Sequence, residues 1–351
     1  MAGALVGVTV IELAGIGPAP FAGMMLADHG ARVIRIDRPG PPAVPIERAG
    51  AYDAINRNRE NRVIDLKQPE GIAALLDLVR EADALIEGNR PGVIERLGIG
   101  PDVLLSANPR LVIGRMTGWG QTGPKADRAG HDINYIALSG ALSTYGPRER
   151  PMAPSNVVAD YGGGMMLAFG LLAGILNART TGQGQVIDCA MLDGAAILSA
   201  MTYSLKANGL WGEGREANVL DGGAPFYDTY ETADGQFVAI GPIEPQFHDL
   251  LMEKLGLAGD PMFRQSMNRA DWPAAKERLR ALFRTRTRDE WCALLEETDA
   301  CLAPVLSLDE APLHPHNVAR GTFIQVDGQL QPAPAPRFSV TPAPPVRRAR
   351  G

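Results

Sequence analysis

The first third of the chain alternates short β-rich runs with helical patterns, and this alternation strongly limits the possible folds. The expected strands are residues 8–13, 32–37, 84–87 and 111–116, which are rich in branched apolar side chains. The expected helices between them are residues 21–29 and 71–80. Short connections between such elements predict a parallel sheet with helices on both faces. Open sheets of this kind bind ligands at the carboxyl ends of their strands.

The pattern changes after about Leu205. Residues 227–232 and 236–240 flank Asp234-Gly235, a pair that suits a two-residue turn between antiparallel strands. Helical stretches follow at 245–255, 273–283 and 288–297, the last with a capping box from Thr287 to Glu290. The expected fold class is α/β, a large Rossmann-like domain with a smaller α+β domain. The expected divisions are a large domain at 1–205, a linker at 206–220, a small domain at 221–306, and a linker and C-terminal segment at 307–351 that returns to the large domain.

Composition narrows the setting and the partners. A chain of 351 residues with 45% hydrophobic content can bury a substantial core. Its net charge of −6 gives no general attraction to nucleic acid, so we expect no nucleic-acid partner. Cys189, Cys292 and Cys301 lack metal-ligand spacing, so we expect reduced thiols, no metal site and a cytoplasmic protein. The N-terminus has no basic segment leading into an apolar run, so we expect no signal peptide.

Residues 161–176 contain no charged side chain and raise the possibility of a membrane span. A spanning helix needs about 20 apolar residues, and this segment opens near three consecutive glycines at 162–164. We therefore expect a buried helix and no membrane partner. Gly170 and Gly174, four residues apart, would let a neighbouring helix or strand pack closely against it.

Gly15-Ile16-Gly17 after the first expected strand suggests a dinucleotide-binding turn. The third glycine of that pattern would fall at position 20, which is Pro20, and Pro18 precedes it. Prolines there remove backbone N–H groups that a pyrophosphate would need. We therefore expect neither a nicotinamide nor a flavin cofactor.

Basic residues cluster at or after the ends of the expected strands. They are Arg38, Arg57, Arg59, Lys67, Arg90 and Arg96. Each one alone is typical of a solvated surface. Together, in an acidic protein, they indicate an anionic ligand with several phosphates, which guanidinium groups bind in a bidentate manner.

His131 and Asp160 are the candidate proton-transfer residues. Both lie on glycine-bounded segments, 130–135 and 160–164, and both groups can exchange a proton near neutral pH when their surroundings tune them. Asp160 could instead cap a helix starting at Tyr161, a role worth about 1 kcal/mol and compatible with catalysis. Glu244 precedes Pro245, which predicts an extended, N-cap-like position and, without other information, a structural role.

Many segments, in order along nearly the whole chain, carry a family resemblance. They are residues 10–15, 35–39, 56–59, 65–67, 87–93, 116–124, 130–135, 160–164, 221–225 and 244–247. Together they resemble the family III coenzyme A transferases and, within that family, the α-methylacyl-CoA racemase branch. The Gly-His-Asp-Ile-Asn-Tyr pattern at 130–135 is typical of that branch. Asn89 departs from the pattern, since aromatic residues are common there in relatives.

The resemblance implies an acyl-CoA substrate, no cofactor because CoA is part of that substrate, and an interlocked homodimer. It assigns the CoA nucleotide, pyrophosphate and pantetheine arm to a defined set of positions. They are Arg38, Ile64, Asp65, Leu66, Lys67, Gly88, Asn89, Arg90, Arg96, Gly130, Asp132, Ile133, Asn134 and Tyr135.

The resemblance also implies a mechanism in which 2-methylacyl-CoA enantiomers interconvert through an enolate. His131 would act on one face of the α-carbon and Asp160 on the other, while Glu244 would orient His131 from the small domain. Backbone N–H groups near Asp160 and the glycine run would stabilise the enolate oxygen.

Two alternatives stay open. The first is a CoA transferase in which Asp160 attacks the acyl thioester and forms a mixed anhydride. The presence of His131 favours the racemase, because transferases of the family generally lack that histidine. The second is a non-catalytic CoA-binding protein, which would not need His131, Asp160 and Glu244. The acyl group, whether a branched fatty acyl, a sterol side chain or an arylpropionyl, is not readable from the residues.

Overall fold

The chain forms two compact units in a computed structural model that describes residues 3–40 and 54–349. The large unit comprises Met1–Ala141, Pro154–Ser199 and Val318–Gly351, and the small unit comprises Leu142–Ala153 and Ala200–Asn317. These boundaries differ from the expected ones. Residues 142–153 join the small unit because Arg215 donates hydrogen bonds to the carbonyl oxygens of Pro147 and Arg148, both at 2.8 Å.

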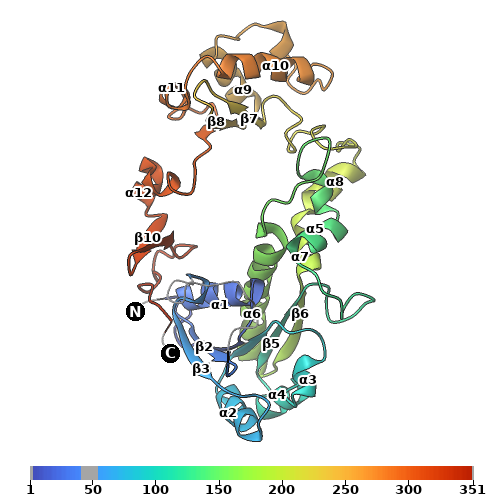
Figure 1. Cartoon of the computed structure of the whole chain (residues 1–351), viewed down its shortest axis with the longest axis vertical. Helices are drawn as coiled ribbons and strands as arrows, with labels where there is room; N and C mark the ends of the chain where they lie inside the picture. The colour runs from blue at the N-terminus through green and yellow to red at the C-terminus, as the bar shows by residue number, and fades with distance from the viewer. Residues whose placement is uncertain (1–2, 41–53, 350–351) are drawn as a thin grey trace. The chain divides into compact units, whose positions relative to one another are not determined.

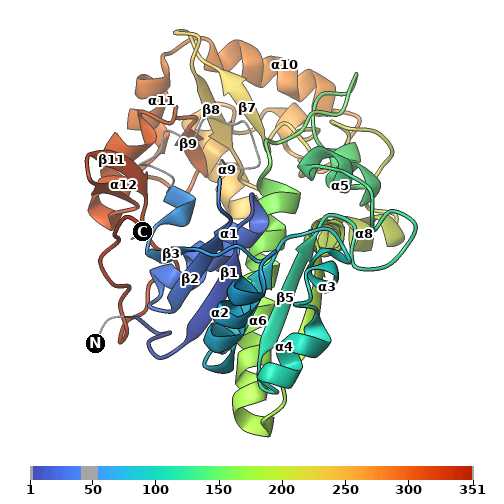
Figure 2. The same ribbon diagram turned by 60° about the horizontal axis from the view of Figure 1, so that its bottom comes forward.

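A six-stranded parallel sheet forms the centre of the large unit and confirms the expected sheet type. Its strands are β1 (Thr9–Leu13), β2 (Arg32–Asp37), β3 (Arg59–Val63), β4 (Ala84–Glu87), β5 (Val112–Thr117) and β6 (Gln185–Ala190). Their order is β3-β2-β1-β4-β5-β6, with every neighbouring pair parallel. Figure 2 shows several of these strands side by side. The strand order reverses between β1 and β4, and sheets of this kind bind ligands beside the loops that follow the two strands at such a reversal.

The sequence did not indicate β3 and β6, which are the two edge strands. β3 reads Arg-Glu-Asn-Arg-Val, and most of its side chains are at least partly exposed. β6 also begins with exposed residues. Edge strands pair on one side only and need no continuous apolar run, so the pattern that identifies central strands is weak in them.

Helices cover both faces of the sheet (Figures 1 and 2). One layer is α1 (Pro18–Asp28) and α6 (Gly162–Thr181), and the other is α2 (Pro69–Arg80), α3 (Val93–Arg96) and α4 (Pro101–Ala107). Successive strand residues point to opposite faces. Val10 therefore packs in the core with Leu167 of α6, whereas Ile11 packs in the core with Leu75 of α2.

Glycines let α6 approach the sheet closely, as expected. A Cβ at Gly174 would lie 2.7 Å from Val112 Cγ1, and one at Gly170 would lie 3.4 Å from Ile187 Cγ2. The segment Val157–Thr181 is long and apolar enough to cross a membrane, judged by length and composition alone. The expectation of a buried helix holds for one face only, since Leu171 is buried whereas Phe169 is 72% exposed.

The small unit combines an antiparallel sheet with helices. The sheet has the order β7-β8-β9, with β7 (Asp228–Glu231), β8 (Phe237–Ile240) and β9 (Leu302–Pro304). The helices of its compact core are α9 (Pro245–Lys254), α10 (Trp272–Phe283) and α11 (Arg288–Leu295). The predicted hairpin and these helices are confirmed to within a few residues. Tyr230 stacks on Phe283 at 5.0 Å between ring centroids, and Trp291 meets the same ring edge-on at 5.1 Å.

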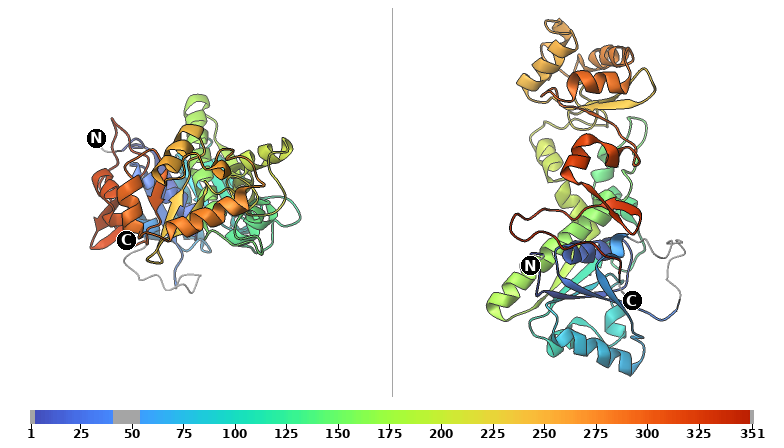
Figure 3. Two further views of the ribbon diagram at one scale, coloured as in Figure 1. Left: turned by 90° about the horizontal axis from the view of Figure 1, so that it is seen from above. Right: turned by 90° about the vertical axis from the view of Figure 1, so that its left-hand side faces the viewer.

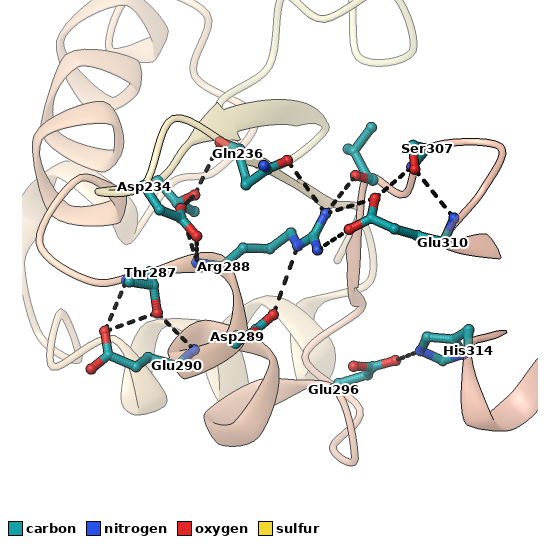
Figure 4. A network of polar contacts seen from close by, with 12 residues as sticks. Asp234, Gln236, Thr287, Arg288, Asp289, Glu290, Glu296, Ser307, Glu310 and His314 are labelled. Atoms are coloured by element: carbon teal, nitrogen blue, oxygen red, sulfur yellow. Dashed lines mark hydrogen bonds and ion pairs between the residues drawn. The ribbon is translucent and has the colours of Figure 1, made fainter.

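Within the small unit, Arg288 binds the segment that follows β9 (Figure 4). Its guanidinium donates to Glu310 Oε1 at 2.6 Å and to the Val305 carbonyl oxygen at 3.3 Å. The hydrogen bond from Arg288 holds the pKa of Glu310 at about 2. The predicted capping box is present next to it, with the Thr287 N–H donating to Glu290 Oε2 at 2.8 Å.

The chain also contains the α-helices α5 (Asp132–Leu138), α7 (Met191–Leu198), α8 (Ala200–Ala207) and α12 (Pro315–Arg320), and the strands β10 (Phe323–Val326) and β11 (Gln329–Pro332). The C-terminal segment runs beside the N-terminal part of the large unit (Figure 3, red beside blue). Arg57 explains this course, because it donates to Asp28 Oδ1 at 2.9 Å, to Gln331 Oε1 at 2.9 Å and to the Pro332 carbonyl oxygen at 2.7 Å. The His29 Nε2 atom also lies 3.0 Å from the Ala335 carbonyl oxygen.

A fully buried ion pair stands inside the sheet layer. Arg59 Nε donates to Glu12 Oε2 at 2.8 Å, and neither side chain is exposed. Arg35 contacts the other carboxylate oxygen at 3.3 Å. Burial raises the pKa of Glu12, and the charges of Arg59 and Arg35 oppose that shift. Gly23 of α1 packs directly on the pair, and a Cβ there would overlap Glu12 Oε2.

Arg57 and Arg59 therefore do not belong to the predicted phosphate-binding group, and this part of the sequence interpretation is wrong. Both side chains are buried in ion pairs with Asp28 and Glu12. The spacing of basic residues along the chain does not distinguish a buried guanidinium from an exposed one.

Arg59→Leu should destabilise the large unit by about 3–5 kcal/mol, because it leaves Glu12 buried without its main cation. The control is Arg32→Leu, whose ion pair with Glu60 is exposed (52% and 42%) and should change the free energy of unfolding by less than about 1 kcal/mol. Urea unfolding at neutral pH measures both. Equal losses in the two variants would contradict the role given to the buried pair.

Candidate active site

The carboxyl ends of the parallel strands bring most of the predicted CoA-binding residues to one edge of the sheet. Arg38 follows β2, residues 64–67 follow β3, and residues 88–90 follow β4. All three strands run in the same direction, so these segments share an edge. Arg38, Lys67 and Arg90 are exposed, as an anion site requires. Ile64, Asp65 and Leu66 are partly buried, and Asp65 Oδ1 accepts a hydrogen bond from the Lys67 N–H at 3.1 Å.

Buried charges shape the loop after β4. Glu87, at the end of that strand, accepts a hydrogen bond from the Asn89 N–H at 2.8 Å and another from Arg115 Nε at 2.8 Å. Burial raises the pKa of Glu87, and the hydrogen bond from Arg115 opposes that shift. Arg115 also binds Glu95 at 2.8 Å. Sequence reasoning did not select Arg115, although an arginine inside an apolar strand is a signal for a buried partner.

The turn after Asn89 holds Arg96 close to the same loop. Gly92 has φ of 79°, and a Cβ there would lie 2.8 Å from Arg96 Nη1. A larger residue at Gly92 would therefore displace this guanidinium. Gly88 lies near Ala19 of α1, since a Cβ at Gly88 would lie 3.3 Å from the Cβ of Ala19.

His131 occupies the N-cap position of α5 and is exposed. Its backbone N–H donates to Asn134 Oδ1 at 3.1 Å. Gly130, the preceding residue, packs against the rings of Tyr135 and Trp119. A Cβ at Gly130 would lie 2.8 Å from Tyr135 and 2.9 Å from Trp119. These two rings stand edge to face at 4.7 Å. The glycine is therefore needed for the packing that sets the direction of the chain into His131.

Asp160 lies in a π-helical turn, Val157–Tyr161, which runs directly into α6. Its carboxylate makes no helix cap, so the capping interpretation is wrong. Asp160 Oδ2 instead accepts a hydrogen bond from Asn156 Nδ2 at 3.1 Å. π-helical turns are rare and occur frequently at functional sites. Neither the turn nor the contribution of Asn156 was visible in the sequence.

The carboxylate of Asp160 reaches the loop after β1. A Cβ at Gly17 would lie 3.6 Å from Asp160 Oδ2. Since β1 borders the reversal of strand order, Asp160 lies next to the loop beside which sheets of this kind bind ligands. A methyl group at Gly17 would press against this oxygen.

Burial is the main reason that the pKa of Asp160 is raised above its ordinary value. The hydrogen bond from Asn156 lowers it, the charge of Asp132 raises it, and His131 lowers it. Burial also raises the pKa of Tyr135 to about 12, with the charge of Asp160 adding to the shift and Arg90 opposing it. The large unit therefore brings His131, Asp132, Tyr135, Asp160 and Arg90 into one electrostatic neighbourhood.

Asp132 faces inward and is 4% exposed, whereas Ile133 and Asn134 are exposed. Its Oδ2 accepts hydrogen bonds from the Ala159 N–H at 2.7 Å and the Asp160 N–H at 2.9 Å. These two donors are therefore occupied. The expectation that backbone N–H groups near Asp160 bind an enolate is wrong for both of them.

Glu244 is the exposed N-cap of α9, with φ −72° and ψ 141°. The extended, N-cap-like position predicted from Pro245 is confirmed. Glu244 belongs to the small unit, whereas His131 and Asp160 belong to the large unit. Its role in orienting His131 stays a prediction.

Within residues 3–40 and 54–349, no three His, Cys, Asp or Glu side chains gather in a way that could hold a metal ion. The site in the large unit is instead a set of proton-exchanging groups beside exposed cations. Such a set can move a proton at a carbon next to a carbonyl group and can bind an anionic carrier.

The comparisons with known proteins agree with this chemistry. The model of CoA-transferase family III matches residues 5–350. The alpha-methylacyl-CoA racemase of Homo sapiens is 47% identical over 345 residues, covering 97% of this chain and 88% of the relative. The succinyl-CoA–D-citramalate CoA-transferase of Chloroflexus aurantiacus is 31% identical, covering 95% of this chain and 88% of the relative.

The fold is also similar to solved structures. The crystal structure of a CaiB/BaiF family protein from Brucella suis superposes with a TM-score of 0.83 at 26% identity, covering 100% of this chain and 97% of that one. Sequence and fold thus agree over the whole length, and the chain belongs to CoA-transferase family III.

Proposed function

We propose that this protein is an α-methylacyl-CoA racemase, an isomerase that interconverts the R and S forms of 2-methylacyl-CoA thioesters. The observation that carries the proposal is the hydrogen bond from the Asp160 N–H to Asp132 Oδ2, at 2.9 Å. Because Asp132 directly follows His131, this bond holds the two candidate bases near each other. The identity of 47% to the human racemase supports it. A single base would suffice for proton removal, but racemisation requires a proton donor on the opposite face.

The reaction needs proton transfer only. One residue takes the α-proton, and the electron pair of the C–H bond moves onto the thioester oxygen as an enolate. The other residue delivers its proton to the opposite face of the α-carbon, and the two residues end with their protonation states exchanged. The raised pKa of Asp160 suits it to both directions, because a general base or acid works best when its pKa approaches the working pH.

No cofactor enters this scheme, because the thioester carbonyl itself accepts the electron pair. Four exposed cations, Arg38, Lys67, Arg90 and Arg96, are proposed to bind the phosphates of CoA. The backbone of residues 64–67, 88–90 and 130–135 is proposed to line the path of the nucleotide and pantetheine arm. Glu244 is proposed to orient His131.

A transferase would use the same Asp160 as a nucleophile, and the relative from Chloroflexus aurantiacus is named as a transferase. Incubation of one enantiomer of a 2-methylacyl-CoA in deuterium oxide, without an acceptor acid, separates the two reactions. We expect α-deuterium incorporation by mass spectrometry and loss of optical purity by chiral analysis. If several such substrates show no exchange, but acyl-CoA forms when a carboxylic acid is added, the protein is a transferase.

We also propose that the protein acts as a homodimer in the cytoplasm, the setting to which its free cysteines point. The outer face of α6 supports the dimer. Met165, Phe169 and Leu176 are 56%, 72% and 70% exposed, and with Leu172 they form an apolar stripe at helical spacing. A second copy of the chain is proposed to cover this stripe, in the interlocked arrangement that the family resemblance implies.

Phe169→Glu should weaken this assembly, because it places a charge in the middle of the stripe. Val103→Glu on α4, an exposed apolar residue on the opposite helical layer, is the matched control. Sedimentation velocity at micromolar concentration should give a dimer for the wild type and the control, and a shift toward monomer for Phe169→Glu. A monomeric wild type would contradict the proposal.

A further inference from the structure

The Asp132 carboxylate is the most unusual polar group next to the proposed bases. It is 4% exposed, and its Oδ1 atom has no hydrogen-bond partner among the described residues. Its Oδ2 atom accepts two backbone hydrogen bonds, from the Ala159 N–H at 2.7 Å and the Asp160 N–H at 2.9 Å. Burying a carboxylate oxygen without a hydrogen-bond partner costs free energy of folding, which indicates that the Asp132 side chain has a functional role.

The two hydrogen bonds join separate parts of the large unit. Asp132 is the first residue of α5, directly after His131, and its acceptor oxygen meets the π-helical turn that carries Asp160. The first N–H groups of a helix have no acceptor within the helix, and Asp132 supplies one across 27 and 28 residues of sequence. The backbone next to one base is thereby fixed to the backbone of the other.

We propose that Asp132 is a positioning residue, which sets the relative placement of His131 and Asp160 through the N–H groups of Ala159 and Asp160. This inference rests on the proposed racemase function. It concerns the Asp132 side chain, whose carboxylate binds backbone N–H groups of the protein, whereas the Asp132 backbone remains part of the segment proposed to line the path of CoA. Two bases that act on opposite faces of one carbon need a fixed separation, and small displacements of reacting groups are costly to the rate.

The charge of Asp132 has a second consequence. Four groups surround the Asp160 carboxylate. The Asn156 amide donates a hydrogen bond to it, and the charges of Asp132 and His131 shift its pKa. The fourth group is Tyr135, whose own pKa is raised by the charge of Asp160. The charge of Asp132 raises the pKa of Asp160 in addition to the larger effect of burial. Removing that charge should lower the pKa of Asp160, so that the carboxylate ionises at lower pH.

The test compares Asp132→Asn, Asp132→Ala and the control Asp102→Asn, which changes an exposed carboxylate in the first turn of α4. The asparagine keeps an acceptor oxygen and the shape of the side chain, whereas the alanine removes both. For the enantiomer whose proton Asp160 removes, kcat/KM increases with pH as Asp160 ionises. In Asp132→Asn this increase should occur at a lower pH than in the wild type. KM for the acyl-CoA should stay within about twofold, while kcat should fall about tenfold in Asp132→Asn and about 100-fold in Asp132→Ala.

Amide hydrogen exchange gives a readout that does not need racemase activity. The amide hydrogens of Ala159 and Asp160 should exchange faster in Asp132→Ala than in the wild type. In the control variant their exchange rates should be unchanged. If the wild-type protein shows no α-exchange at all, the proposed function fails, whereas unaltered protection of these two amides in Asp132→Ala overturns the positioning role. A raised KM with unchanged kcat would make Asp132 a substrate contact and would also overturn it. Reduced thermal stability without a shift of the pH profile in Asp132→Asn would reduce Asp132 to a structural residue.

Discussion

The reversal of strand order between β1 and β4 determines where this molecule can do chemistry, because the chain leaves these two neighbouring strands toward opposite faces of a fully parallel sheet. Gly17 after β1 and Gly88 after β4 border that edge, and neither has a side chain to fill it. The π-helical turn before α6 then delivers Asp160 to Gly17. The cations after β2, β3 and β4 follow from the same topology, since parallel strands end at one edge.

Buried charges hold this edge in place, and each is balanced in its own way. Glu12 is compensated by two arginines inside the sheet, and Glu87 by Arg115 and a backbone N–H. Asp132 accepts two backbone N–H groups on one oxygen, and its other oxygen has no hydrogen-bond partner in the described part of the chain. It lies next to Asp160, whose pKa is raised by burial. Neighbouring carboxylates thus take different roles because their surroundings differ, one as a fixed acceptor and one as a proton-exchanging group.

The sequence predicted the central strands well, because β2 and β4 are largely buried and rich in branched apolar residues. It missed the edge strands β3 and β6, whose side chains are partly exposed. His131 and Asp160 were found by residue type and glycine context, and the structure places both in the large unit. The inward direction of Asp132 and the burial of Arg57 and Arg59 were missed, because they depend on long-range packing that no local pattern records.

In the proposed reaction, two bases act on opposite faces of one α-carbon. The direct test incubates His131→Ala and Asp160→Ala separately with each pure enantiomer of a 2-methylacyl-CoA in deuterium oxide. We expect each variant to exchange the α-proton of one enantiomer only, and we expect the preferred enantiomer to differ between the variants. Neither variant should racemise its substrate. Racemisation at the wild-type rate by both variants, or exchange of the same enantiomer by both, would contradict the assignment of His131 and Asp160 as the two bases.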